Sequence, residues 1–413
     1  MSTNGRRVVV TGMGLVSPCG HTVEESWKNI SAGVSGIARI AAFDVSAYDS
    51  QIGGEVKGFD PERHMDKKEA RRADRSVQFA FAAAAGAMAG IEGSGFDADR
   101  FGAIIGSGIG GITTFEQQHT VLMEKGPSRI SPFFIPMMIS DMSAGQLSIR
   151  YGLKGPNFGT VSACASGGHA ICDAYMYVKH GFADMMLAGG TEATISPMAL
   201  GGFCSMKALS TRNDAPERAS RPFDRDRDGF VMAEGCGLVV LEELGHARRR
   251  GAAILAELAG IGLTGDAYHI TSPAPGGAGA VNAMRMAIAT AGLEPGAVDY
   301  INAHGTSTAY NDKTEADAIG TVFGPESAVK VSSTKSVHGH MLGAAAAIEF
   351  IVCVSAMRDG LIPPTMNLDN PDPECSLNHV ANAAERRGLR AVMSNSFGFG
   401  GHNVCLLLRR FEE

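Results

Sequence analysis

The sequence predicts an α/β fold with largely buried sheets, and three observations support this. Short apolar runs rich in β-branched residues alternate with Ala-rich runs of helical length, a pattern that places helices over the faces of sheets. The chain has 413 residues, too many for one ordinary core, so two domains or one large α/β unit are expected. Finally, two segments follow one plan, which indicates an internal duplication.

The strands are predicted from apolar, β-branched runs and the helices from periodic, Ala-rich runs. The predicted strands are residues 8–10, 103–105, 185–188, 237–241, 300–302, 330–332 and 404–408. The predicted helices are residues 77–89, 143–151, 168–180, 280–291, 313–322 and 342–357.

The two similar segments each combine a strand, a reactive residue and a helix that starts with small residues. One segment leads through Cys164 into the predicted helix that follows it, and the other leads through Lys335 into the predicted helix 342–357. We interpret them as parts of two related halves with a seam near residues 245–260. The predicted domains are therefore residues 1–252 and 253–413.

Composition and charge narrow the class of function. The net charge of −7 argues against a nucleic-acid or membrane-surface binder, although it leaves room for a local basic patch. The most apolar stretch, residues 341–357, is short for a membrane span and contains Glu349. The eight cysteines form no C-x-x-C pair, which favours reduced thiols. Residues 1–12 lack a signal-peptide core, so we expect a cytoplasmic protein.

Cys164 is the strongest candidate for chemistry. It follows a β-branched run and precedes Ala-Ser-Gly-Gly-His-Ala at a predicted helix start. Such a small turn lets a substrate carbonyl approach, the helix dipole favours the thiolate, and backbone N–H groups can stabilise an oxyanion. Most cysteines are small buried hydrophobes, but this context favours a nucleophile.

Two histidines, His304 and His340, lie in glycine-bounded turns after predicted strands. Taken alone, each would more often be a hydrogen-bonded structural residue. His338 and His340 could form half of a metal site, but no third ligand stands at a suitable spacing, so no metal is expected. Lys335 lies in an apolar region where it needs a buried anion, and Glu349 is the candidate.

Weaker signals have simpler explanations. Gly12-Met-Gly14 is similar to the start of a dinucleotide loop, but Ser17 replaces the third glycine and no suitable acidic residue follows. The glycine run at 106–111 lacks the lysine of a phosphate-binding loop. The run Asn-Ser-Phe-Gly-Phe-Gly-Gly-His-Asn at 395–403 is a glycine-rich turn or a mobile plug for a cavity.

Basic residues cluster on one predicted helix, at Lys67, Lys68 and Arg71 with Arg72 and Arg75 beside them. Interleaved acidic residues make a solvated face the simpler explanation. The cluster is nevertheless unusual in a chain of net charge −7.

Together these motifs resemble the 3-oxoacyl-[acyl-carrier-protein] synthases of the elongating, Cys-His-His type. The likeness covers nearly the whole chain and looks closest to the type II synthase of bacterial fatty-acid synthesis. Its motifs are V-S-A-C-A-S-G around Cys164, N-A-H-G-T-S-T around His304, S-S-T-K-S-V-H-G-H-M-L-G-A-A with Lys335 and His340, N-S-F-G-F-G-G at 395–401, S-T-R-N-D-A-P-E-R-A-S-R-P-F-D at 210–224 and D-A-Y-H-I-T-S-P at 266–273.

The resemblance implies a thiolase-like fold, in which two duplicated α/β halves stack as five alternating layers, and a homodimer. It implies decarboxylative Claisen condensation: an acyl group passes from acyl carrier protein to Cys164, and malonyl carrier protein loses CO2 and attacks it. The products are 3-oxoacyl carrier protein, CO2 and free carrier protein. No cofactor is implied, because the substrates are carried on the phosphopantetheine arm of the carrier protein.

The resemblance also implies roles for individual residues. His304 and His340 would stabilise the enolate oxygen as neutral donors, with their division of roles left open, and Lys335 would orient the site with Glu349. The other implied sites are the oxyanion hole at the N–H groups of Cys164 and Phe399, the gate at Phe399, the acyl pocket at Ile109, the phosphopantetheine contacts Thr271, Thr306 and Thr308, and the carrier-protein docking residues Lys67, Lys68, Arg71 and Lys207.

Three departures from the family's pattern affect the expected preference for acyl chain length more than they affect the expected reaction. They are His402 where Thr is frequent, Tyr310-Asn311 after H-G-T-S-T-A, and Cys236 for an Ala. Ile109 nevertheless favours longer chains.

Four alternatives compete with this interpretation. A standalone type II polyketide ketosynthase shares the Cys-His-His set. A CoA-dependent thiolase would need a second cysteine near the C-terminus, and a catalytically silent chain-length partner would usually lack Cys164. A dinucleotide-binding oxidoreductase would need a better glycine fingerprint.

Overall fold

The computed structural model describes residues 5–91, 93 and 95–412, so residues 1–4, part of the N-terminus used above to predict location, lie outside it. Its strands are β1 Val8–Val16, β2 Ala38–Arg39, β3 Ile52–Gly53, β4 Phe101–Gly106, β5 Asn157–Thr160, β6 Met185–Glu192, β7 Gly235–Glu243, β8 Ala256–Gly265, β9 Tyr300–Asn302, β10 Lys330–Ser332, β11 Leu361–Ile362, β12 Glu385–Arg386, β13 Ala391–Gly398 and β14 His402–Arg409. Its α-helices are α1 Val23–Ser31, α2 Lys67–Ala70, α3 Arg75–Met88, α4 Ile112–Lys125, α5 Phe134–Met138, α6 Met142–Tyr151, α7 Ser166–Lys179, α8 Pro197–Ser205, α9 Leu244–Arg249, α10 Ala278–Thr290, α11 Ala309–Phe323, α12 Lys335–His338 and α13 Ala345–Asp359.

The main sheet repeats one strand plan twice. Its order is β10-β9-β13-β14-β8 followed by β1-β7-β6-β4-β5. If the five strands of each half are numbered in chain order, their order outward from the central β8/β1 pair is first, fifth, fourth, second, third in both halves. In both halves the second strand pairs in parallel with its two neighbours, and the fourth and fifth strands pair antiparallel. The internal duplication that the sequence predicts is present.

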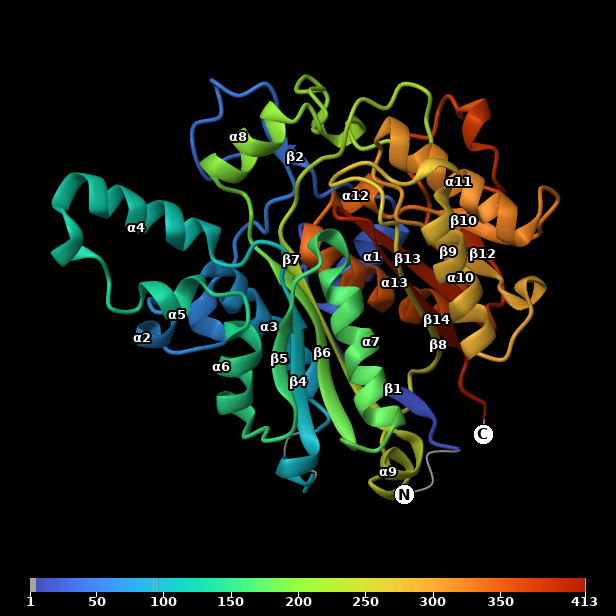
Figure 1. Cartoon of the computed structure of the whole chain (residues 1–413), viewed down its shortest axis with the longest axis horizontal. Helices are drawn as coiled ribbons and strands as arrows, with labels where there is room; N and C mark the ends of the chain where they lie inside the picture. The colour runs from blue at the N-terminus through green and yellow to red at the C-terminus, as the bar shows by residue number, and fades with distance from the viewer. Residues whose placement is uncertain (1–4, 92, 94, 413) are drawn as a thin grey trace.

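Helices complete a five-layer stack (Figure 1). Helices α3 and α6 cover the outer face of the first half, and α10 and α11 cover the outer face of the second half. Helices α7 and α13 lie between the halves, since α7 contacts both β6 and β14 and α13 contacts both β7 and β13. The predicted thiolase-like α/β fold is confirmed.

Helix α13 explains the most apolar stretch of the sequence. It is buried at every position from Ala345 to Met357, because it is enclosed by protein on all sides in the central layer. In the part of the chain that the structure describes, no helix is long and apolar enough to cross a membrane.

The run 395–403 contains the predicted glycine-rich turn at residues 399–401, which joins the end of β13 to the start of β14. One prediction of local structure is wrong, because the basic residues do not share one helix. Helix α2 ends at Ala70, and the side chain of Asp74 accepts a hydrogen bond from the N–H of Ser76 to cap a new helix, α3.

The duplicated turns also correspond differently from the prediction. A 3₁₀ turn at Ala163–Ala165 leads into α7, and another at Leu342–Ala344 leads into α13. Each turn starts with a residue in the left-handed region, Ala163 at φ 51° and Leu342 at φ 46°. Gly343, not Lys335, therefore occupies the position in the second half that Cys164 occupies in the first half. Lys335 belongs to α12, an addition between the strand and the turn.

Candidate active site

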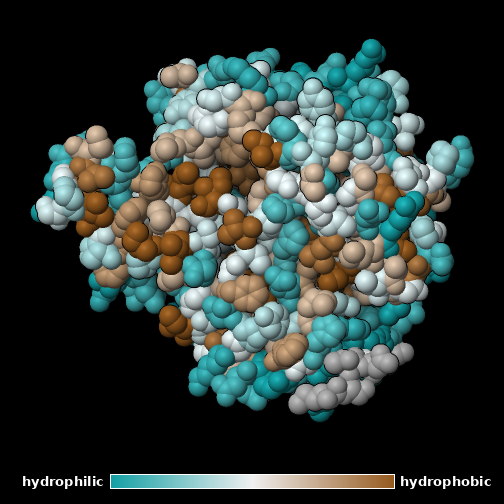
Figure 2. Space-filling model, viewed as in Figure 1, coloured by the Kyte–Doolittle hydropathy of each residue, from teal (hydrophilic) through white to brown (hydrophobic). Residues whose placement is uncertain are grey.

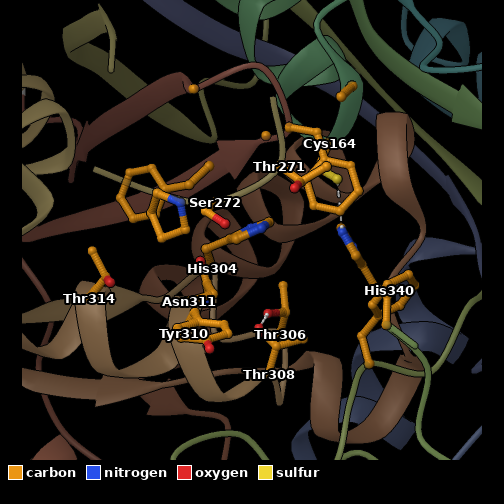
Figure 3. A pocket seen from close by; sticks show the side chains of 18 of the residues that line it. Cys164, Thr271, Ser272, His304, Thr306, Thr308, Tyr310, Asn311, Thr314 and His340 are labelled. Carbon is orange, nitrogen blue, oxygen red and sulfur yellow. Dashed lines mark hydrogen bonds between the residues drawn. The ribbon is translucent and has the colours of Figure 1, made fainter. Parts of the chain in front are cut away.

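A hollow of about 490 Å³ is lined by residues of both halves, and most of the candidate residues are among them (Figure 3). Lys335 and Glu349 lie behind its wall, and the α2 residues Lys67, Lys68 and the adjacent Arg71 are not part of its lining. The candidate residues that line it are Ile109, Cys164, Lys207, Thr271, His304, Thr306, Thr308, His340 and Phe399.

Cys164 and His340 meet inside this hollow. The Nε2 atom of His340 lies 3.1 Å from the sulfur of Cys164, and Figure 3 shows the two side chains pointing at each other. The backbone of His340 is fixed by the first half of the chain, because its N–H donates to the carbonyl of Val231 at 2.7 Å and its carbonyl accepts from Ala233 at 2.9 Å. The position of the imidazole relative to the sulfur thus depends on contact between the halves.

Burial controls the ionisation of Cys164. It raises the pKa of the thiol to about 12, against the opposing effects of Lys335 and of the backbone N–H groups of Phe399 and Cys164. The backbone N–H groups at the helix start favour the thiolate, but in the free enzyme desolvation is the larger effect. The sulfur rests as a thiol, and His340 is the base within reach.

The same two N–H groups, those of Cys164 and Phe399, both hydrogen-bond the sulfur of Cys164. Close approach is possible because Gly398 has no side chain: a Cβ there would lie 2.8 Å from the carbonyl oxygen of Ser162. Phe399 follows on a turn whose Gly400 and Gly401 have φ of 85° and 74°.

Lys335 and Glu349 form a buried ion pair, the contact that the sequence analysis expects. Lys335 is 1% exposed and Glu349 is 0% exposed. Burial raises the pKa of Glu349 to about 7, while the positive charge of Lys335 acts in the opposite direction.

Lys335 also sets the tautomer of His304. Its Nζ donates to the carbonyl of His304 at 2.6 Å and lies 3.4 Å from His304 Nδ1. An ammonium group can only donate, so Nδ1 accepts and the ring proton lies on Nε2. His304 consequently presents a hydrogen-bond donor to the pocket.

Both histidines are held neutral. Burial lowers the pKa of His304 and of His340 well below the usual value of 6.5, and the charge of Lys335 lowers both further. Their rings pack edge to face with centroids 5.3 Å apart. Two neutral imidazoles thus stand side by side next to the cysteine.

Sequence reasoning missed Glu315, which lines the hollow and supports His304. Its carboxylate accepts the backbone N–H groups of His304 at 2.8 Å and Gly305 at 2.7 Å, and burial raises its pKa to about 7. A signal was available, because residues 312, 315, 316 and 319 share the buried face of α11 and two of them are acidic.

The remaining candidates occupy the mouth and the surface. Thr306 and Thr308 share a hydrogen bond of 2.9 Å, and Lys207 pairs with Asp49 at 2.8 Å while 78% exposed. Lys67 pairs loosely with Glu62 at 3.8 Å. Among the residues for which coordinates are described, no group of three or more His, Cys, Asp or Glu side chains is placed to hold a metal ion.

Comparison with known proteins finds similarity over the whole chain. The model of the beta-ketoacyl synthase N-terminal domain matches residues 5–247, and that of the C-terminal domain matches residues 255–369. A protein from Staphylococcus aureus named 3-oxoacyl-[acyl-carrier-protein] synthase 2 is 51% identical over 100% of both chains. One of the same name from Synechocystis is 49% identical over 98% of this chain and 99% of its own.

Solved structures share the fold. A beta-ketoacyl synthase from Burkholderia phymatum is 34% identical with a TM-score of 0.92, covering 98% of this chain and 100% of its own. A ketosynthase of a type II polyketide synthase, in complex with its acyl-carrier protein and bound to the hexaketide, is 35% identical with a TM-score of 0.91 over the same shares.

Proposed function

Because this chain belongs to the beta-ketoacyl synthase family, we propose that it is a 3-oxoacyl-[acyl-carrier-protein] synthase that elongates fatty acids. The observation that carries the proposal is the 3.1 Å contact between Cys164 and His340, with His304 beside them. A nucleophile, a base and a neutral donor stand together in one hollow. About half of the positions match full-length relatives that bear this name.

In the first half-reaction, Cys164 takes the acyl group. His340 Nε2 accepts the thiol proton, and the sulfur attacks the thioester carbonyl, whose oxygen is stabilised by the N–H groups of Cys164 and Phe399. The carbon–sulfur bond to the phosphopantetheine arm then breaks. The departing thiolate takes the proton from His340, giving acyl-Cys164 and free carrier protein.

In the second half-reaction, malonyl carrier protein loses CO2, and the electrons of the broken carbon–carbon bond form an enolate. The neutral Nε2–H of His304, whose ring lies beside that of His340, donates to the enolate oxygen. The enolate carbon attacks the acyl carbonyl in the oxyanion hole. Cys164 leaves as a thiolate and regains a proton from solvent. We propose that Thr271, Thr306 and Thr308 hold the phosphopantetheine arm, and that no further cofactor takes part.

Product analysis tests this function. The protein is mixed with an acyl carrier protein and with malonyl carrier protein labelled with carbon-13 in its free carboxyl group. We expect labelled CO2 and unlabelled 3-oxoacyl carrier protein in equal amounts. Release of CO2 without any new carbon–carbon bond would contradict an elongating role.

A type II polyketide ketosynthase is the second candidate, favoured by the solved complex that carries a hexaketide. Identity to that protein is 35%, against 51% and 49% for the two synthase relatives. The substrate distinguishes them, since a polyketide enzyme would extend 3-oxoacyl chains. Activity with saturated acyl chains and none with 3-oxoacyl chains would support fatty-acid elongation.

The two catalytic histidines should not titrate in moderate acid. Because the pKa values of His304 and His340 are lowered well below 6.5, both rings stay neutral as the pH falls through that value. We expect any change in the single-turnover condensation rate of pre-acylated enzyme between pH 8 and pH 6 to follow the carboxyl groups of Glu315 and Glu349, whose pKa values are raised to about 7. A decline with an apparent pKa near 6.5 that persists in Glu315→Gln and in Glu349→Gln would show that a histidine titrates normally.

We propose that acyl carrier protein docks through Lys67, Lys68, Arg71 and Lys207. Lys67, Lys68 and Arg71 lie on the surface at α2, and Lys207 lies at the mouth, so positive charge is available to an acidic partner despite the net charge of −7. Lys67→Glu with Lys68→Glu should lower kcat/KM for carrier-protein substrates about tenfold while leaving free thioester mimics nearly unchanged. Equal loss with both substrates would rule out docking there.

We also propose a cytoplasmic homodimer. Strand β5 lies at one end of the main sheet, and Val161 next to it is 63% exposed. Figure 2 shows apolar surface on the side where α4 projects, and the exposed apolar residues there and nearby include Phe115, Met123, Ile135 and Ile139. Light scattering should report twice the chain mass of 43.1 kDa. Cell fractionation tests the location.

A further inference from the structure

Glu192 is a buried carboxylate that the proposed reaction leaves unused. It is the last residue of β6 and is 0% exposed. Buried carboxylates are normally paired with a cation. Within the described part of the chain, however, the groups that donate to Glu192 are all neutral.

Four donors from two distant segments converge on this carboxylate. The hydroxyl of Ser107 donates to Oε1 at 2.9 Å, and the N–H of Ile109 donates to the same atom at 3.2 Å. The N–H groups of Gly108 and Gly343 donate to Oε2 at 2.7 Å and 2.9 Å. Glu192 therefore ties the turn after β4, in the first half, to the turn before α13, in the second half.

The surroundings are shaped to fit the carboxylate. A Cβ on Gly108 would lie 2.8 Å from Glu192 Oε2, and one on Gly343 would lie 2.6 Å from the same atom and 2.3 Å from the N of Gly108. Both turns therefore need glycine in order to reach one carboxylate. The four hydrogen bonds to the oxygens of Glu192 offset part of the free-energy cost of burying its carboxylate.

The turn that Glu192 holds carries a wall of the pocket. Ile109 lines the hollow around Cys164 and also a neighbouring hollow lined by Phe115 and Met138. Ile109 is therefore shared by the linings of the two hollows. The backbone position of this residue therefore determines how much room an acyl group on Cys164 has in that direction.

We propose that Glu192 is a positioning residue that sets acyl chain length by fixing the Ser107–Ile109 turn against Gly343. This rests on the proposed function, since it presumes an acyl chain on Cys164. A carboxylate accepts at both oxygens, whereas the carboxamide of Glu192→Gln accepts at one and turns an NH2 group towards two donors. The variant therefore frees one side of the turn.

The test compares octanoyl- and hexadecanoyl-carrier protein as substrates. We expect Glu192→Gln to move the ratio of their kcat/KM values about tenfold towards equal use, because Ile109 is no longer held in place. In an Ile109→Ala background the same change should move the ratio less than about twofold, since the side chain to be positioned is gone. Glu242→Gln, which removes a 0% exposed carboxylate on the neighbouring β7, is the control and should lower stability alone.

Equal loss of both substrates in Glu192→Gln, or a ratio shift that persists without the Ile109 side chain, would overturn the proposal. If Glu192→Gln does not fold, Ser107→Ala is tested in its place, since it removes one of the four donors to Glu192. The proposal then predicts a smaller shift of the kcat/KM ratio in the same direction, and no shift would overturn it. Absence of product from the unmodified protein with every chain is a different outcome, because it contradicts the proposed function and not the role of Glu192.

Discussion

Replacing Cys164 with alanine should lower the condensation rate at least about a thousandfold, because Cys164 is the one thiol among the described residues that line the hollow. The loss should appear in turnover and not in the fold. Cys164 is 8% exposed, and the change removes one sulfur atom, for which we expect a cost of about 1 kcal/mol in the free energy of unfolding. Stopped-flow turnover and urea denaturation measure the two effects.

Cys172→Ala is the matched control for this substitution. Cys172 is 1% exposed and lies in α7, the helix that follows the nucleophile. It should lose similar stability and keep its activity. Comparable turnover loss in both variants would mean that disturbance of α7, and not the missing thiol, stops the reaction.

Replacing Lys335 with methionine should reduce both stability and activity. It leaves Glu349 buried without its cation, which typically costs about 3–5 kcal/mol. Burial already raises the pKa of Glu349 to about 7, and loss of Lys335 raises it further. The folded variant thus favours the protonated carboxyl, so its stability should fall as the pH rises from 6 to 8.

The double variant Lys335→Met with Glu349→Gln separates the two effects. Removing both charges should restore much of the free energy of unfolding. It should not restore turnover, because His304 Nδ1 would still lack the donor that keeps its proton on Nε2. We expect a condensation rate reduced about a hundredfold or more. Recovery of activity with stability would show that Lys335 acts only on folding.

Local sequence patterns predicted the parts of the site that lie in continuous motifs. Cys164, His304 and His340 each stand in a glycine-bounded turn, and an isolated lysine and glutamate in one apolar region suggested the Lys335–Glu349 pair. The alternation of strands and helices predicted the α/β class. These features depend on residues near each other in the chain, which is why they can be recognised without a structure.

Features that depend on contact between distant segments could not be predicted from local patterns alone. Glu192 accepts from residues 84 and 151 positions away, and no local pattern indicates that its side chain is buried. The raised pKa of Cys164 is a second such feature, because burial in the folded chain outweighs the backbone N–H groups that lower the pKa. The break between α2 and α3 depends on the cap at Asp74, which competes with a continuous helical pattern.

Intact-protein mass spectrometry tests the central claim most directly. The protein and its Cys164→Ala variant are each mixed with acyl carrier proteins of increasing chain length, and malonyl carrier protein is then added. We predict an acyl adduct on the unmodified protein alone, which disappears when the malonyl substrate arrives. An adduct that also forms on Cys164→Ala, or none from any chain borne by the carrier protein, would contradict the claim that Cys164 holds the acyl group for condensation.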